Sequence, residues 1–115
     1  MQEPMKYPFE HHFLICTGAR CNNENRGDER GEMIRGDLKD LNKSLGRKKT
    51  VRVCSVSCLD LCDHGPNMIA YPSGEVYSHL DRASAIRAYN GEMGDGAKAT
   101  DKLLDREEFE KLRKK

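Results

Sequence analysis

The sequence predicts one small α+β domain with the element order β-α-β-β-β-α. A chain of 115 residues is long enough to bury a single modest hydrophobic core. Two short runs, at residues 12–16 and 50–56, have the apolar or β-branched composition of strands, and a stretch with helical periodicity separates them. A hairpin pattern and a second helix follow, which completes the order.

The first half of the chain predicts a strand, a loop, a helix and a strand. The run HFLIC at residues 12–16 is continuously apolar, as in a strand covered on both faces. The next segment, TGARCNNENRGDERG, predicts a loop because it holds three glycines and three asparagines. A helix is predicted for residues 32–45, closed by Gly46. Its single apolar stripe consists of Ile34, Leu38, Leu41 and Leu45. The run TVRVCSV at residues 50–56 predicts the second strand.

A hairpin is expected next. Residues 68–71 and 75–77 flank PSG, with Pro72 and Gly74 at the second and fourth positions favoured in a type I turn. The large apolar residues of this hairpin also offer a possible edge for pairing with another chain.

The last part of the chain predicts two helices. Asp81 can cap a helix over residues 82–89, which Asn90 and Gly91 would close. The segment GEMGDGAKAT is expected to be a linker. The tail DREEFEKLRKK begins with the capping-box pair Asp105 and Glu108 and predicts a final charged helix.

These elements divide the chain into an irregular arm (residues 1–11), a domain (residues 12–90), and a linker with a charged C-terminal helix (residues 91–115). A β-α-β start followed by a β-β-α end makes a layered α+β arrangement like the core of thioredoxin. The predicted fold is therefore thioredoxin-like.

Composition limits the classes of function. The formal net charge is +1, so no strong field favours nucleic acid, and no apolar run is long enough for a membrane span. The N-terminal segment lacks the apolar core of a secretory signal, which predicts a cytoplasmic protein. In a reducing cytoplasm, cysteines more often hold a metal or do redox work than form structural disulfides.

Four of the five cysteines form two spaced pairs. Cys16 and Cys21 have the spacing C-x4-C, and Cys58 and Cys62 have the spacing C-x3-C. Each pair falls where a predicted strand gives way to a loop. Because the carboxyl ends of two parallel strands share one edge of a sheet, the two pairs should meet there. Four converging thiolates predict a metal site.

Several occupants of this site can be compared by their chemistry. Structural zinc usually takes tight C-x2-C pairs, which neither spacing provides. A 2Fe–2S cluster is wider than a single ion and suits longer loops. A Rieske centre would need two histidines beside two cysteines, but no His follows the first pair. A catalytic dithiol would need C-x-x-C at a helix start, and C-x4-C is too long for it. The spacings favour the 2Fe–2S cluster, with zinc as the remaining metal alternative.

The motifs FLICTGARC and CLDLCDHGPNMIAYPSGEVY resemble those of the thioredoxin-like 2Fe–2S ferredoxins. The same fold forms the small iron–sulfur subunit of NADH dehydrogenases and related hydrogenases. The matching positions are Cys16, Cys21, Cys58, Cys62, Gly65, Pro66, Pro72, Gly74 and Tyr77. The resemblance covers roughly residues 12 to 90 and implies four cysteine ligands, a 2Fe–2S cofactor, redox protein partners and a homodimer paired through its sheets.

The fifth cysteine, Cys54, has the same C-x3-C spacing to Cys58 as Cys58 has to Cys62. The β-branched residues around Cys54 predict a place inside a strand, so we expect a small buried hydrophobic residue there. A spare ligand is the alternative. His64, between Cys62 and Gly65, is either an exposed loop residue or a donor that links a cluster potential to pH.

The expected function is that of a low-potential one-electron carrier and not an enzyme, because no acid–base constellation is evident in the chain. Two alternatives stay open at this point. The chain could be an electron-relay subunit of an NADH- or hydrogen-oxidising complex. It could also be a zinc-binding or cluster-free thioredoxin-like protein that serves assembly or metal delivery.

Overall fold

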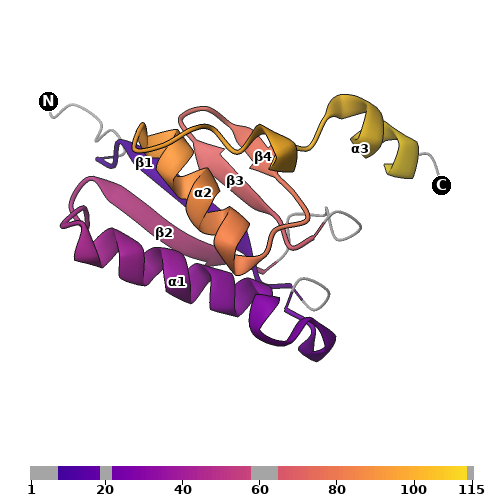
Figure 1. Ribbon diagram of the computed structural model, residues 1–115, viewed down its shortest axis with the longest axis horizontal. Coiled ribbons are helices and arrows are strands. Elements are labelled where there is room, and N and C mark those ends of the chain that lie inside the picture. Colours follow the sequence, from indigo (N-terminus) through magenta and orange to yellow (C-terminus); the bar gives the residue numbers. More distant parts are fainter. Residues whose placement is uncertain (1–7, 19–21, 58–64, 114–115) are drawn as a thin grey trace, which may run out of the picture.

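The computed structural model describes residues 8–18, 22–57 and 65–113 (Figure 1). The elements, in chain order, are β1 (His11–Cys16), η1 (Glu24–Glu29), α1 (Gly31–Ser44), β2 (Val51–Val56), β3 (Met68–Tyr71), β4 (Glu75–Tyr77), α2 (Arg82–Met93), η3 (Thr100–Lys102) and α3 (Arg106–Arg113). The longer strands and helices follow the order predicted from the sequence. None of the helices in these ranges combines the length and apolar content that a membrane span requires.

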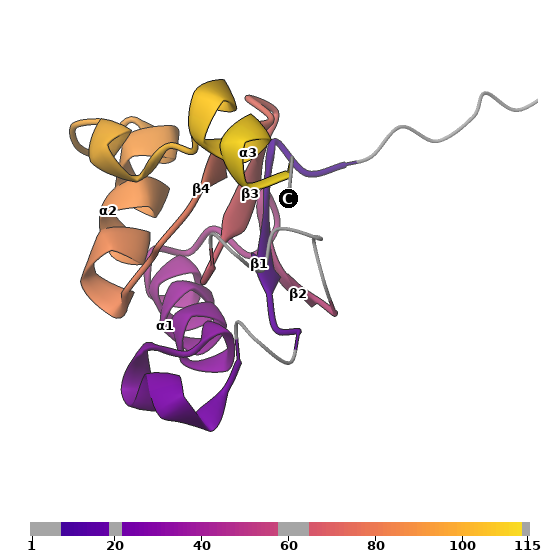
Figure 2. The same ribbon diagram turned by 90° about the vertical axis from the view of Figure 1, so that its right-hand side faces the viewer.

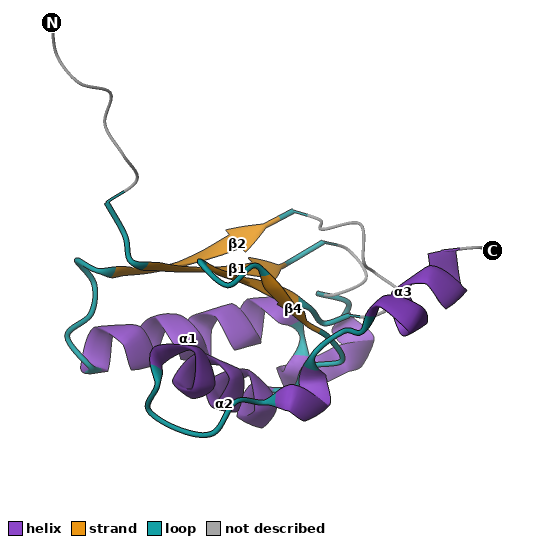
Figure 3. Ribbon diagram, turned by 90° about the horizontal axis from the view of Figure 1, so that it is seen from above, coloured by secondary structure: helices purple, strands orange, loops and turns teal. Residues whose placement is uncertain are grey.

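The four strands form one mixed sheet in the order β2-β1-β3-β4. β1 runs parallel to β2 and antiparallel to β3, which in turn pairs antiparallel with β4. Helices α1 and α2 lie side by side on one face of this sheet (Figures 2 and 3). The predicted α+β single domain is confirmed.

The hydrophobic core fills the space between the sheet and the two helices. On β1, Phe13 and Ile15 are fully buried, whereas the intervening Leu14 is only partly buried. The expectation that this strand is covered on both faces is therefore wrong. The alternation arises because successive side chains of a strand point to opposite faces and both helices pack on the same one.

The predicted helix and strand boundaries agree closely with the structure up to residue 81. Both hairpin strands have the predicted bounds, and β1, β2 and α1 each begin or end within one residue of expectation. The hairpin turn differs, however. The N–H of Gly74 donates to the carbonyl of Ala70 at 2.6 Å, so the chain reverses over five residues and not over the four of a type I turn.

Helix α2 is longer than predicted. It continues past Tyr89 to Met93 and ends at Gly94, whose φ of 80° is left-handed. Gly91, expected to close the helix, lies inside it. A Cβ atom at Gly91 would lie 2.8 Å from the Cα of Lys98. This glycine therefore allows the following segment to pack closely against α2.

The segment expected to be a linker packs against the domain. Ala99 is buried in the core, and Leu103 forms a β-bridge with Tyr77. The backbone of residues 102–104 also pairs with the end of β4, through Ser78 N to Lys102 O at 2.7 Å and Leu104 N to Val76 O at 2.9 Å. The outer side of β4 is thus occupied by the chain itself, so this strand is not the free edge that the hairpin suggested.

A buried polar contact joins three elements of the core. Asn42 of α1 is buried, and its Nδ2 donates to the carbonyl of Val51 at the start of β2 at 2.9 Å. The hydroxyl of Tyr89 on α2 donates to Oδ1 of the same Asn42 at 2.7 Å. Buried polar groups are costly to leave without partners. Asn42 therefore fixes α1, β2 and α2 relative to one another.

We expect Asn42→Ala to lower the free energy of unfolding by about 2–4 kcal/mol, because it leaves the Val51 carbonyl and the Tyr89 hydroxyl buried without their partner. Urea denaturation followed by circular dichroism measures the change. The matched control is Asn25→Ala, at an exposed position of η1, which should stay within about 0.5 kcal/mol of the parent. Equal effects of the two substitutions would contradict this role of Asn42.

Candidate metal centre

The carboxyl ends of β1 and β2 lie next to each other, as the predicted metal site requires. Cys16 and Val56 are paired in the parallel ladder. The residue after β1, Thr17, donates to the Val56 carbonyl from its N–H at 2.8 Å and from its hydroxyl at 3.0 Å. The chain therefore leaves both strands at one edge of the sheet.

Cys16 is the predicted ligand that the structure describes. Its side chain is fully buried, and its N–H donates at 3.1 Å to the carbonyl of Asn67, just before β3. Cys16 thus lies between the residues that precede and follow segment 58–64. The other three predicted ligands, Cys21, Cys58 and Cys62, lie outside the described residues, as does His64.

The described flanks of the two cysteine loops also contact each other. Nη1 of Arg26, in η1, approaches the carbonyl of Gly65 at 3.4 Å. The adjacent Pro66 accepts a 2.9 Å hydrogen bond from Leu80 N. Within the first loop, Asn22 accepts from the N–H of Glu32 at 2.9 Å, so its side chain holds the start of α1. These contacts connect the first loop, the Gly65–Pro66 bend and the domain core.

Arg26 was not recognised from the sequence as part of this region. It lies in a polar, turn-rich loop, where a single arginine carries no distinguishing pattern. Its cationic side chain nevertheless contacts Gly65, the first described residue after segment 58–64. A positive charge there would favour a negatively charged group held by thiolates.

Cys54 lies within β2, as the β-branched residues around it predicted. Its predicted burial in the core is wrong, because Cys54 is only partly buried. Val53 faces the helices and is buried, so by strand alternation its neighbour Cys54 faces the uncovered side of the sheet, across from Leu14. Its thiol is thus separate from the helix-covered core.

The histidines of β1 lie at the end of that strand away from Cys16. Burial, and to a lesser extent the positive charge of Arg52, lower the pKa of His12. His12 is therefore largely neutral at pH 7. The pair His11–His12 therefore lies at the start of β1 and away from Cys16.

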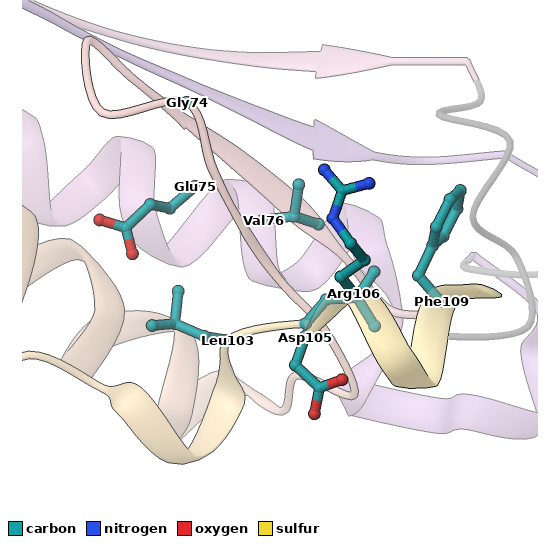
Figure 4. A pocket seen from close by; sticks show the side chains of 8 residues that line it. Gly74, Glu75, Val76, Leu103, Asp105, Arg106 and Phe109 are labelled. Atoms are coloured by element: carbon teal, nitrogen blue, oxygen red, sulfur yellow. The ribbon is translucent and has the colours of Figure 1, made fainter. Parts of the chain in front are cut away.

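Among the described residues, no group of three or more His, Cys, Asp or Glu side chains is placed to hold a metal ion. A hollow of about 520 Å³ lies elsewhere, between β4 and α3 (Figure 4). It combines the apolar side chains of Val76, Leu103 and Phe109 with the charged Asp105 and Arg106. The hollow borders β4, whereas Cys16 ends β1.

Solved structures of a thioredoxin-like [2Fe-2S] ferredoxin from Aquifex aeolicus have the same fold. Its wild-type structure has a TM-score of 0.70 and 14% sequence identity, covering 85% of this chain and 99% of that one. A cysteine-to-serine variant gives a TM-score of 0.70 and 13% identity, covering 84% and 99%. No protein-family model and no curated protein matches the sequence. The chain therefore has the thioredoxin-like ferredoxin fold.

Proposed function

We propose that this protein is a low-potential one-electron carrier that holds a 2Fe–2S cluster through Cys16, Cys21, Cys58 and Cys62. The observation that carries the proposal is the position of Cys16. It is buried where the ends of β1 and β2 are joined by the Thr17–Val56 hydrogen bonds. The two segments with the predicted ligands follow the sheet at this one place, and the Aquifex aeolicus protein with the same fold is a [2Fe-2S] ferredoxin.

The donor set fits such a cluster. Cysteine thiolates are the usual ligands of 2Fe–2S clusters, and an all-cysteine set gives potentials on the order of −400 mV in plant-type ferredoxins. A bound cluster would supply the one-electron redox chemistry. This chain would supply the thiolates, the buried surroundings of Cys16, and the positive charge of Arg26 beside the Gly65 carbonyl. Hydrogen bonds and nearby charge tune such potentials.

We further propose redox proteins as partners and the cytoplasm as the place of action, with no nucleic-acid or membrane partner. Electron transfer to such partners needs no catalytic residues on this chain. The same cluster would serve equally in an electron-relay subunit of an NADH- or hydrogen-oxidising complex. Isolation of the protein from its native cell, free or bound to a larger oxidoreductase, would separate these two roles.

Protein purified without oxygen should contain about two irons and two sulfides per chain and absorb between about 300 and 600 nm. Reduction should produce an electron paramagnetic resonance signal from a spin-half state. Stoichiometric zinc without sulfide, in protein made with ample iron, would contradict the proposal and favour the zinc-binding alternative. Protein without any metal after chemical reconstitution would favour the cluster-free alternative.

Substitution of single cysteines tests the ligand set. Replacing Cys16, Cys21, Cys58 or Cys62 with Ala should abolish or strongly alter the visible spectrum and the iron content, because each change removes one thiolate. Cys54→Ala is the matched control. It should leave both unchanged and cost about 1 kcal/mol of stability, since Cys54 is only partly buried. Loss of the cluster in Cys54→Ala, with a normal cluster in Cys62→Ala, would show that Cys54 is the ligand.

We also propose a homodimer that pairs through the sheet face opposite α1 and α2. Partly buried or exposed apolar side chains occupy this face, and no described helix lies over its centre. They include Leu14, Ile69, Tyr71 and Val76. Tyr71, which is 46% exposed, is unusually accessible for a large aromatic side chain. Covering such a face would remove apolar surface from water.

Light scattering at micromolar concentration should report a dimer for the parent protein. Ile69→Glu should shift it to a monomer, because Ile69 lies between Leu14 and Val76 in the sheet and a charge there would be buried without a partner. Leu45→Glu is the control, as Leu45 is 46% exposed at the end of α1, and it should remain dimeric. A monomeric parent protein would refute the dimer.

A further inference from the structure

The two edge strands of the sheet, β2 and β4, differ in whether their outer backbone groups are hydrogen-bonded. The outer side of β4 pairs with residues 102–104 of the same chain. At the other edge, among the residues that the structure describes, β2 pairs only with β1, and α1 runs beside it (Figure 1). An edge strand with unpaired backbone groups is a template for adding another strand.

The backbone of β2 offers such groups at two residues. The carbonyls of Thr50 and Val56 accept hydrogen bonds from the β1 side, from His11 N and Thr17 N. In a parallel ladder the alternate residues point the other way, so Val51, Val53 and Ser55 turn their N–H and C=O groups outward. Those of Val51 are satisfied by the carbonyl of Arg47 and the side chain of Asn42.

The outward N–H and C=O groups of Val53 and Ser55 have no hydrogen-bonding partner among the described residues. Ser55 is exposed, and Val53 is 8% exposed. Val53 and Ser55 are two residues apart, as successive outward-facing residues of a strand are. Two such residues are enough to begin pairing with an extended segment, because antiparallel and parallel ladders both use alternate residues.

A basic groove of about 200 Å³ borders this edge. Its four cations are exposed and come from α1, from the following turn and from β2, and one carboxylate, Asp40, lies among them. The cations are Lys39, Lys43, Lys48 and Arg52. None of them forms an ion pair with another described residue. Other cations of the described chain, such as Arg47, Arg82 and Arg87, do pair with carboxylates.

We propose that the β2 edge and its basic groove are a docking site for an extended, acidic segment of a partner protein. The segment adds as a strand to β2, and its carboxylates lie against Lys39, Lys43, Lys48 and Arg52. Backbone pairing supplies affinity in this mode of recognition, and the flanking charges select the partner. The site uses the outer side of β2, opposite the side that pairs with β1, and its test does not depend on the proposed cluster.

Charge argues for this occupant over two others. A second copy of β2 would bring the same cations against one another, which opposes pairing between copies. Nucleic acid would find the cations but would not use the outward N–H and C=O groups of the strand. An acidic extended peptide matches both the charges and the backbone.

The probe is a synthetic peptide of about ten residues in which Glu and Thr alternate, a length and pattern suited to one strand. A peptide with Gln in place of Glu and an oligothymidylate of similar charge are the comparisons. Binding to the intact protein is followed by nuclear magnetic resonance. We expect saturable binding of the acidic peptide, with shifts and slower hydrogen exchange at the amides of Val53 and Ser55, and much weaker binding of both comparisons.

Two variants separate the charge from the backbone. Lys43→Glu should weaken binding of the acidic peptide about fivefold, whereas Arg106→Glu, on an 88% exposed side chain of α3, should have little effect. Ser55→Pro removes an outward N–H and should also weaken binding, while Ser55→Thr should not. Circular dichroism verifies that each variant folds. If Ser55→Pro fails to fold, hydrogen exchange at the amides of Val53 and Ser55 in the parent protein tests whether the peptide pairs with the backbone of β2.

Absence of binding by the acidic peptide would overturn the proposal. It would equally be overturned if Lys43→Glu and Arg106→Glu had the same effect. Binding of oligothymidylate as tight as that of the peptide, without slower exchange at Val53 and Ser55, would identify a general polyanion surface instead. None of these outcomes depends on iron content, so they are distinguishable from failure of the cluster proposal.

Discussion

Two parallel strands that are neighbours in a sheet cannot be joined by a tight turn, and β1 and β2 are joined by a long crossover that contains α1. This pairing determines most of the molecule. It places α1 over one face of the sheet, and it brings the carboxyl ends of both strands to one edge, where Thr17 bonds to Val56. The candidate metal centre lies at this edge because the connection is a crossover and not a hairpin.

The same pairing leaves one face of the sheet covered by helices and the other face uncovered. Helix α2 packs beside α1 on the same face, where Asn42 links both helices to β2. A second contact between the helices is the ion pair of Arg82 with Asp37, in which the Arg82 hydrogen bonds lower the pKa of the carboxyl group. With both helices on one side, the other face keeps partly exposed apolar residues. Arg52 belongs to both that face and the basic groove, because by strand alternation it lies on the same side of the sheet as Cys54, whereas Lys39 and Lys43 of the groove lie on α1.

The segment after α2 explains why the two edges of the sheet differ. Arg87 of α2 binds the carboxylate of Asp101 through two hydrogen bonds of 3.0 Å, and Lys98 pairs with Glu75 of β4. These contacts, together with the close packing at Gly91, position residues 102–104 beside β4, where their backbone forms hydrogen bonds with it. The β4 edge is thereby closed, and β2 is left as the edge at which a strand from another protein can add.

Local patterns in the sequence determined the elements and the candidate ligands. Apolar periodicity predicted α1, short apolar or β-branched runs and the PSG turn predicted the strands, and the cysteine spacings indicated where a cluster would be held. These features depend on residues a few positions apart, so they can be read along the chain. The sequence did not reveal which face Cys54 occupies, that residues 94–104 pack on the domain, or that Arg26 approaches Gly65. Each of these depends on segments distant in sequence that meet only when the sheet and helices assemble, and so only the tertiary structure decided them.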